Sequence, residues 1–261
     1  LETKDYLPEI HGTIRTKFEY QTEMAASRFE VRNARISITG NVLPIVAYKA
    51  EIDLSDEGQI KMLDAYARLF PIKDLTVTAG QMRVPFTIDA HRSPHQQYFA
   101  NRSFIAKQVG NVRDVGVTLG YKFGTGVPVT LEGGLYNGSG LTNQKEWHKE
   151  VNYSAKVQFL FAKKLNLALS IQSIQPQEVR INSYDIGAFY EFGRFHIEGE
   201  YLYKTYADNA YDRITGGITF SLSKAFRTDL RLNYEKYFYA KNSIAKESEQ
   251  DKIVLELMVR F

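Results

Sequence analysis

Apolar and polar residues alternate one by one through most of this 261-residue chain, and this period of two limits the possible folds more than any other feature. Side chains of a strand point alternately to its two faces, so such alternation indicates strands with one apolar and one polar face. The segment 58–70, which has good helix propensity, also alternates, and the sequence therefore predicts an all-β fold. The clearest alternating segments are 10–20, 46–54, 114–123, 195–204, 226–235 and 252–261.

Short and longer connections follow one another along the chain. The short breaks fall at 41–44, 71–74, 124–127, 162–166, 192–194 and 223–225, and the mostly longer, more polar ones at 22–27, 55–58, 86–110, 138–149, 175–182, 206–211 and 239–250. Between them we count about fourteen strands of roughly 9–13 residues, long enough to cross a bilayer at a tilt. An even number of strands places both termini on the side of the short turns.

Two β architectures fit two-faced strands, a soluble sandwich and a membrane barrel. Sandwich strands average only about 5–6 residues, and a sandwich has no reason to separate short turns from long loops by side. The polar faces here carry full charges on strand after strand, which suits a wet lumen rather than a dry core. Aromatic residues near the strand ends suit the two bilayer interfaces. They are Tyr20, Tyr121, Phe123, Phe192, Phe195, Tyr203, Phe220, Phe226 and Phe261. We therefore expect a transmembrane antiparallel up-and-down β-barrel that forms a single domain over 1–261.

Composition excludes several other classes of protein. The chain has no cysteine, which removes thiolate metal sites, thiol nucleophiles and disulfides. A net charge of +3 gives no bulk electrostatic reason to expect a nucleic acid partner. No apolar run reaches the roughly 18 residues of a membrane helix. The first residues, "LETKDYLPEI", lack the features of a signal peptide, so we expect a mature chain whose signal has been removed or a chain that never had one.

The segment 28–40 fits the alternation least well. Ala34, Ile36 and Ile38 continue one apolar face, whereas Phe29 and Val31 fall on the opposite parity. A β-bulge explains the change, and so does an upper half of the strand that stands clear of the bilayer. Both interpretations stay open on the sequence.

Several stretches, in this order, resemble the phosphate-selective porins of the O and P type. They are "GQMRVPF" (80–86), "NRSF" (101–104), "VRDVGVTLGYKF" (112–123) and "LYNGSG" (135–140). The stretch "RFEVRNARISITGNV" and the closing aromatic residue are also similar to that family. The resemblance is best from about residue 28 to about residue 160. It implies an outer-membrane barrel of a Gram-negative bacterium.

The resemblance also implies that the third extracellular loop, here 86–110, folds into the lumen and narrows it. The cations in and beside this loop would then form a constriction that favours anions. They are Arg83, Arg92, Arg102, Lys107 and Arg113. The plainer alternative is that these cations pair with acidic wall residues and only hold the loop in place.

The predicted inward faces carry charges of both signs. We expect the lumen lining to include Arg15, Lys17, Arg68, Lys122, Arg227, Arg231, Glu198 and Glu200. Members of the family have about sixteen strands and a ladder of cations, so this mixed lining does not carry over phosphate selectivity. Two hypotheses follow: a passive porin for small, anionic solutes, or a barrel with a plugged lumen that serves as a structural subunit of a larger outer-membrane complex.

Other site types have little support. His91 and His95 lie four apart, but Pro94 interrupts the spacing and no third ligand is evident, so we expect no metal and no cofactor. No histidine lies in a recognisable catalytic setting, and we expect no enzyme. The resemblance implies that Phe261 belongs to the signal read by the outer-membrane assembly machinery. The expected partners are outer-membrane lipid, lipopolysaccharide, and a homotrimer or other outer-membrane proteins.

Overall fold

The computed structural model describes the backbone of residues 6–21, 26–88, 113–162, 164–175, 179–193, 195–206, 209–223, 228–238 and 252–260, with side chains up to residue 205. Its strands, in chain order, are β1 (Glu9–Gln21), β2 (Ala26–Leu43), β3 (Val46–Asp56), β4 (Gln59–Leu69), β5 (Leu75–Arg83), β6 (Arg113–Phe123), β7 (Val129–Tyr136), β8 (Asn152–Phe161), β9 (Leu165–Ile174), β10 (Ile181–Phe192), β11 (Phe195–Tyr206), β12 (Asn209–Ser223), β13 (Thr228–Phe238) and β14 (Lys252–Arg260).

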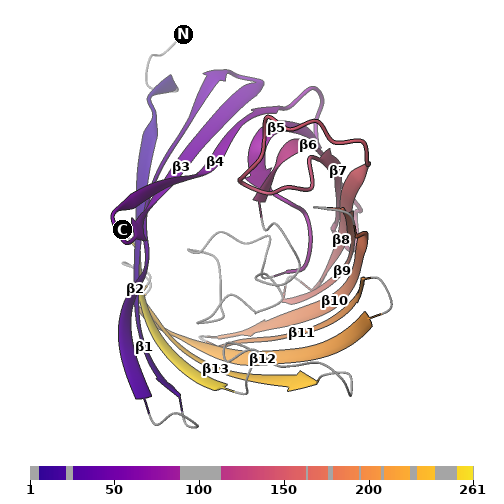
Figure 1. Cartoon of the computed structure of the whole chain (residues 1–261). Coiled ribbons are helices and arrows are strands. Elements are labelled where there is room, and N and C mark those ends of the chain that lie inside the picture. The colour runs from indigo at the N-terminus through magenta and orange to yellow at the C-terminus, as the bar shows by residue number, and fades with distance from the viewer. Residues whose placement is uncertain are drawn as a thin grey trace.

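The strands form one closed antiparallel barrel in which each strand pairs with its neighbours in sequence (Figure 1). The ring closes between the first and the last strand, where the register runs from Thr13 opposite Arg260 to Phe18 opposite Leu255. The predicted all-β, antiparallel, up-and-down architecture is therefore confirmed. In the described part of the chain no helix is long and apolar enough to cross a membrane.

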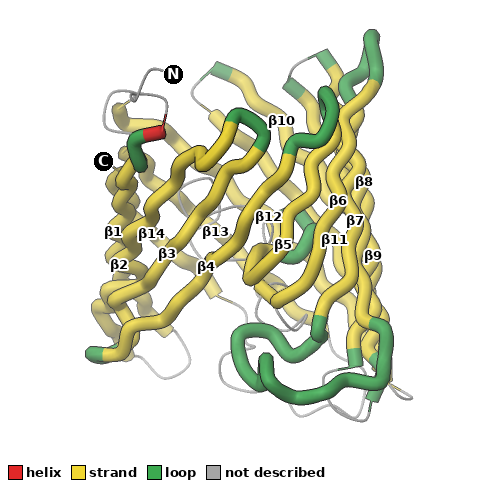
Figure 2. The backbone as a smooth tube through the Cα atoms, turned by 90° about the horizontal axis from the view of Figure 1, so that it is seen from above, coloured by secondary structure: helices red, strands yellow, loops and turns green. Residues whose placement is uncertain are grey.

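The long connections lie at one end of the barrel, as the sequence indicates. The connections at the end where β1 starts are all short, and the ordered 137–151 connection lies at the other end (Figure 2). The break at 55–58 belongs to the side of the mostly longer connections but is itself a tight turn. Only Glu57 and Gly58 separate β3 from β4, and both have a positive φ, as a two-residue hairpin requires.

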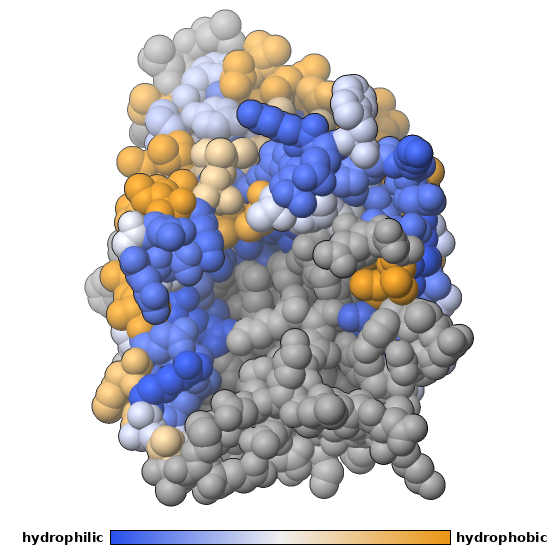
Figure 3. Space-filling model, viewed as in Figure 1, coloured by the Kyte–Doolittle hydropathy of each residue, from blue (hydrophilic) through white to orange (hydrophobic). Residues whose placement is uncertain are grey.

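The faces of the strands carry opposite chemistry. Apolar side chains such as Ile10, Leu119 and Ile197 are exposed on the outside, whereas charged side chains such as Arg15, Glu51 and Glu198 are buried inside. Hydrophobic colour follows the outer contour of the barrel beside β1 to β4, and hydrophilic colour borders the opening (Figure 3). This polarity is the reverse of that of a soluble protein and suits a barrel surrounded by lipid.

A bulge resolves the irregular parity of the second strand. Arg15 pairs with Asn33 and Thr16 pairs with Val31, so Arg32 is an extra residue inserted between these two pairs. Phe29 and Val31 beyond the bulge are exposed on the same outer face as Ile36 and Ile38 before it. Of the two interpretations left open by the sequence, the structure selects the bulge.

Aromatic pairs mark both rims of the outer surface. Near the short turns, Tyr121 stacks on Phe123 with ring centroids 5.9 Å apart, and Phe192 stacks on Phe195 at the same distance. At the opposite end, the ring centroid of Phe18 lies 5.0 Å from that of its cross-strand partner Phe29. Tyr184 and Tyr203 form a similar pair near that rim. Two such belts are typical of the two interfaces of a bilayer.

Candidate functional site: the inner wall of the barrel

An ionic cluster covers the inner wall from β2 to β6. We define it as Arg35, Lys49, Glu51, Asp53, Asp64 and Arg113, which the barrel register brings together although they are up to 78 positions apart. Arg113 lies 2.9 Å from Glu51 and 2.5 Å from Asp64, and Lys49 lies 2.8 Å from each of the same two carboxylates. Arg35 bonds Asp53 at 2.7 Å.

Within the ionic cluster each cation has at least one carboxylate partner. Three cations face three carboxylates, and their side chains are at most 12% exposed. Buried charges need such partners, because each would otherwise lose its hydration without compensation. This ionic cluster is therefore close to neutral, and its two arginines are held in fixed positions rather than presented to a passing solute.

The chain enters the lumen directly after β5. We call residues 84–88 the inward segment, and all five are buried. Ser154 Oγ on β8 donates to the Pro85 carbonyl at 2.9 Å, and the Thr87 amide donates to Ser170 Oγ on β9 at 2.9 Å. The Ile88 amide donates to a Glu200 carboxylate oxygen on β11 at 2.7 Å. Three hydrogen bonds thus fasten the start of the third long connection to the wall that faces the ionic cluster.

Apolar contacts reinforce these hydrogen bonds. Val84 and Phe86 form a buried cluster with Tyr136 and Leu202, two wall residues that point inward. Ile88 fits beside Gly187, where an added Cβ would come within 2.8 Å of Ile88 Cδ1. A small hydrophobic core therefore lies inside the barrel, on the side of β7 to β11.

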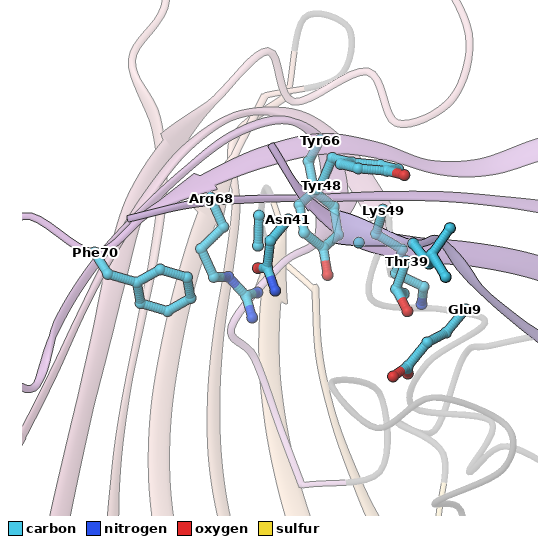
Figure 4. Close-up of a pocket in the computed structure, with 11 residues that line it drawn as sticks. Glu9, Thr39, Asn41, Tyr48, Lys49, Tyr66, Arg68 and Phe70 are labelled. Atoms are coloured by element: carbon cyan, nitrogen blue, oxygen red, sulfur yellow. The ribbon is translucent and has the colours of Figure 1, made fainter. Parts of the chain in front are cut away.

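A recess of about 570 Å³ lies at the short-turn end, against β2 to β4 (Figure 4). It is lined by Leu7, Glu9, Thr39, Gly40, Asn41, Ala47, Tyr48, Lys49, Tyr66, Arg68 and Phe70. Arg68 Nε donates to Thr78 Oγ1 at 2.9 Å, and its guanidinium carbon lies 5.1 Å from the centroid of the Tyr66 ring.

The structure places some of the predicted constriction cations on the wall rather than in the loop. Arg83 is the last residue of β5 and Arg113 is the first residue of β6, so both belong to strand ends. Arg113 pairs with Glu51 and Asp64, as the plainer alternative expects for such cations. Arg92, Arg102 and Lys107 lie outside the described residues, as does the course of 89–112.

The structure describes the side chains of most of the predicted lumen-lining residues. Arg15 and Lys17 are buried inside β1, and Lys17 pairs with Glu19 at 2.8 Å and with Glu30 at 3.1 Å. Glu198 meets His196 at 2.8 Å, while Lys122 is exposed at the short-turn end of β6.

The structure gives less detail for the predicted residues near the C-terminus. Arg231 is on β13, opposite Thr219 and Glu256, and its side chain is not described. Arg227 and Phe261 lie outside the described residues.

Sequence reasoning missed the residues that receive the inward segment. Leu202 is an apolar residue at an inward position, and Gly187 is a glycine inside a strand, which often marks a close approach of another segment. Together these two irregularities could have located the contact. Ser154 and Ser170 carry no such signal in the sequence, because small polar residues are ordinary on a wet face.

Comparisons with known proteins agree with this geometry. The family model described as phosphate-selective porin O and P matches residues 9–174. No curated protein matches the sequence. Among solved structures, Salmonella typhi OmpF in complex with daunomycin is similar with a TM-score of 0.60 at 13% identity, over 100% of this chain and 99% of that one.

Two further porin-like structures show the same fold. The trimer form of the outer membrane protein OmpT of Vibrio cholerae gives a TM-score of 0.55 at 9% identity, over 98% of both chains. A mutant of the Rh. blastica porin gives a TM-score of 0.54 at 11% identity, over 98% of this chain and 100% of that one. Identities this low support the fold alone.

Proposed function

Because the chain belongs to the phosphate-selective porin O and P family and is thus a porin of the bacterial outer membrane, we propose that it lets small anionic solutes diffuse passively. The observation that carries this proposal is the inverted polarity of the barrel. Its outer face is apolar between two aromatic belts, and its inner face carries paired charges and hydrogen-bonding groups. A wall of this kind stays wetted and can conduct solutes.

The preference for anions rests on the third long connection. The ionic cluster is near neutral, so it provides no excess of positive charge to a solute. Arg92, Arg102 and Lys107 in the connection add three cations. The buried inward segment supports an inward course for the connection that carries them. We propose that these three residues, with Arg83 and Arg113 at the strand ends, form the narrowest and most positive part of the channel.

Single-channel recording in planar bilayers tests this proposal. A salt gradient should give a reversal potential of the sign for anion preference. The double substitution R92Q/R102Q should move that potential toward zero, because it removes two cations from the constriction. The matched control is K122Q, which removes an exposed inward cation at the short-turn end and should change selectivity less. Equal shifts of the reversal potential in both variants would show that the loop cations do not set the preference for anions.

A plugged barrel that serves as a structural subunit is the second candidate. The observation that favours it is the internal packing, since Val84, Phe86, Tyr136 and Leu202 fill part of the lumen with a dry cluster. The same recordings separate the two candidates. Steady open-channel current rejects the plugged barrel, whereas a silent protein that co-purifies with other outer-membrane proteins rejects the porin.

The assembly of the whole chain belongs to the same proposal. We propose one membrane domain over 1–261 with about fourteen strands, in contact with lipid and lipopolysaccharide. One of the similar solved structures is a trimer form, which supports a homotrimer here. Phe261 is proposed as part of the assembly signal.

A further inference from the structure

Arg68 differs from the other inward cations of the ionic wall. Lys49, which lines the same recess, bonds two carboxylates at 2.8 Å. Among the described residues, by contrast, the interactions of Arg68 are a hydrogen bond from Nε to Thr78 and a contact with the Tyr66 ring. Strands β4 and β5 therefore hold the guanidinium in place while its charge stays uncompensated by a carboxylate.

The hydrogen bond that Arg68 already makes determines which edge of its guanidinium group can bind a ligand. Nε is used by Thr78, so the two terminal nitrogens are the donors that remain for a ligand. A guanidinium binds a carboxylate best through two parallel N–H groups, and the terminal pair provides such an edge. In Figure 4 the Arg68 side chain extends from its strand on the same side as Asn41, Lys49 and Thr39.

The rest of the recess is suited to a flat apolar group. Tyr66 and Phe70 contribute aromatic residues to its lining, and Leu7 and Ala47 add aliphatic ones. The recess therefore combines aromatic and aliphatic surface with several polar groups, and such a lining can orient a small molecule.

The charge of the recess favours a ligand with a single negative charge. Glu9 lines it, and the charge of Lys49 is already balanced by Glu51 and Asp64. A doubly charged anion would be attracted by Arg68 alone and repelled by the carboxylate of Glu9. We infer that the recess is a binding site for a small monocarboxylate with a flat apolar group, whose carboxylate lies on the terminal nitrogens of Arg68 and whose ring lies against Tyr66 and Phe70. The inference rests on the proposed function, because the solute would reach the recess through the same lumen.

Binding of 4-fluorobenzoate to the full-length protein in detergent micelles, followed by fluorine NMR, tests the inference. We expect saturable binding that R68Q weakens at least about tenfold, since a charge-assisted hydrogen-bonded pair is lost. K122Q is the matched control and should bind like the parent protein. Inorganic phosphate at equal concentration should compete poorly. Unchanged binding in R68Q, or phosphate that competes as well as unlabelled benzoate, would overturn the inference.

A second variant keeps the test decisive if R68Q does not fold. F70A removes a ring at the end of β4 that is 38% exposed. It should weaken 4-fluorobenzoate severalfold and leave the weaker binding of acetate unchanged. Equal losses for both ligands would contradict a ring site. The binding assay needs no current, so a barrel that binds but does not conduct would reject the proposed channel and retain the recess.

Discussion

Single residues inside the barrel act mainly as partners of one another. Arg113 has two carboxylates within 2.9 Å, and both it and they are almost fully buried. Removing one member of such a group leaves the others with uncompensated charge, which costs more than the pair contributes. The strength of this wall therefore depends on complete pairing.

The substitution R113M should lower the free energy of unfolding by about 3 kcal/mol, because it leaves Glu51 and Asp64 without their arginine. The matched control is R28M. Arg28 also has two carboxylate partners, Glu19 and Glu30, but its side chain is 67% exposed. Its loss should cost less than about 1 kcal/mol. Guanidinium unfolding in detergent micelles measures both values, and similar costs would show that burial adds nothing to the cluster.

The contact of Ile88 with Gly187 makes a second prediction at this scale. G187A should destabilise the protein by about 1–3 kcal/mol, because the new methyl group would overlap Ile88. I88V removes the Cδ1 atom that lies closest to that methyl group, so the double variant G187A/I88V should recover part of the loss. The same unfolding assay checks the cycle. Strictly additive costs would mean that the inward segment does not press on β10.

The sequence could not reveal these partners. Arg113 meets Asp64 from 49 positions away, and Ile88 meets Glu200 from 112 positions away. Such meetings depend on the register of every intervening strand and on the diameter of the ring. The charge of each inward residue was predictable from alternation, but its partner was not.

At the scale of elements, the alternation of apolar and polar residues was sufficient to predict that the elements are strands and which side chains point inward. Segment 58–70 shows why, since its helix propensity is good and it still forms β4, with Asp64 inward and Ala67 exposed. Burial of one face decides over propensity when a strand lies between two others. Alternation fails where a strand has a bulge, for example at Arg32 on β2 and at Leu63, where β3 and β4 shift register.

Deleting Arg32 tests the bulge on β2. Arg32 is the extra residue of this strand, so its removal should leave Phe29 and Val31 outside and Asn33 inside. The shortened chain should still form the barrel. The control is deletion of Ser37, a buried inward residue in the regular part of the strand, which would move one flank of apolar residues to the wrong face. Heat-modifiable mobility on gels reports folding, and failure of both variants alike would contradict the interpretation.

At the scale of the whole molecule, the lumen has two unlike sides. The wall from β2 to β6 carries the near-neutral ionic cluster, and the wall from β7 to β11 carries a dry cluster that fastens the inward segment. The inward segment therefore occupies the side of β7 to β11. The recess with Arg68 lies on the side of β2 to β4, at the short-turn end.

Closure of the ring predicts tolerance to a new order of strands. The start of β1 and the end of β14 lie at one end of the barrel, so a short linker can join them. A circular permutant opened between Glu57 and Gly58, at an exposed hairpin, should fold. A chain cut before Lys252 should not, because it loses β14. Heat-modifiable gel mobility distinguishes the two, and a folded truncated chain would contradict the need for closure.

The pairing of β1 with β14 also sets an order of events in time. The two strands that must meet are the first and the last of the barrel in chain order, separated by all the other strands. Until the last strand arrives, the growing sheet has two open edges, each ready to pair with any other strand. Contacts of such high contact order form slowly. The chain therefore needs protection on its way to the membrane, and its final segment is the part whose arrival ends that vulnerable period.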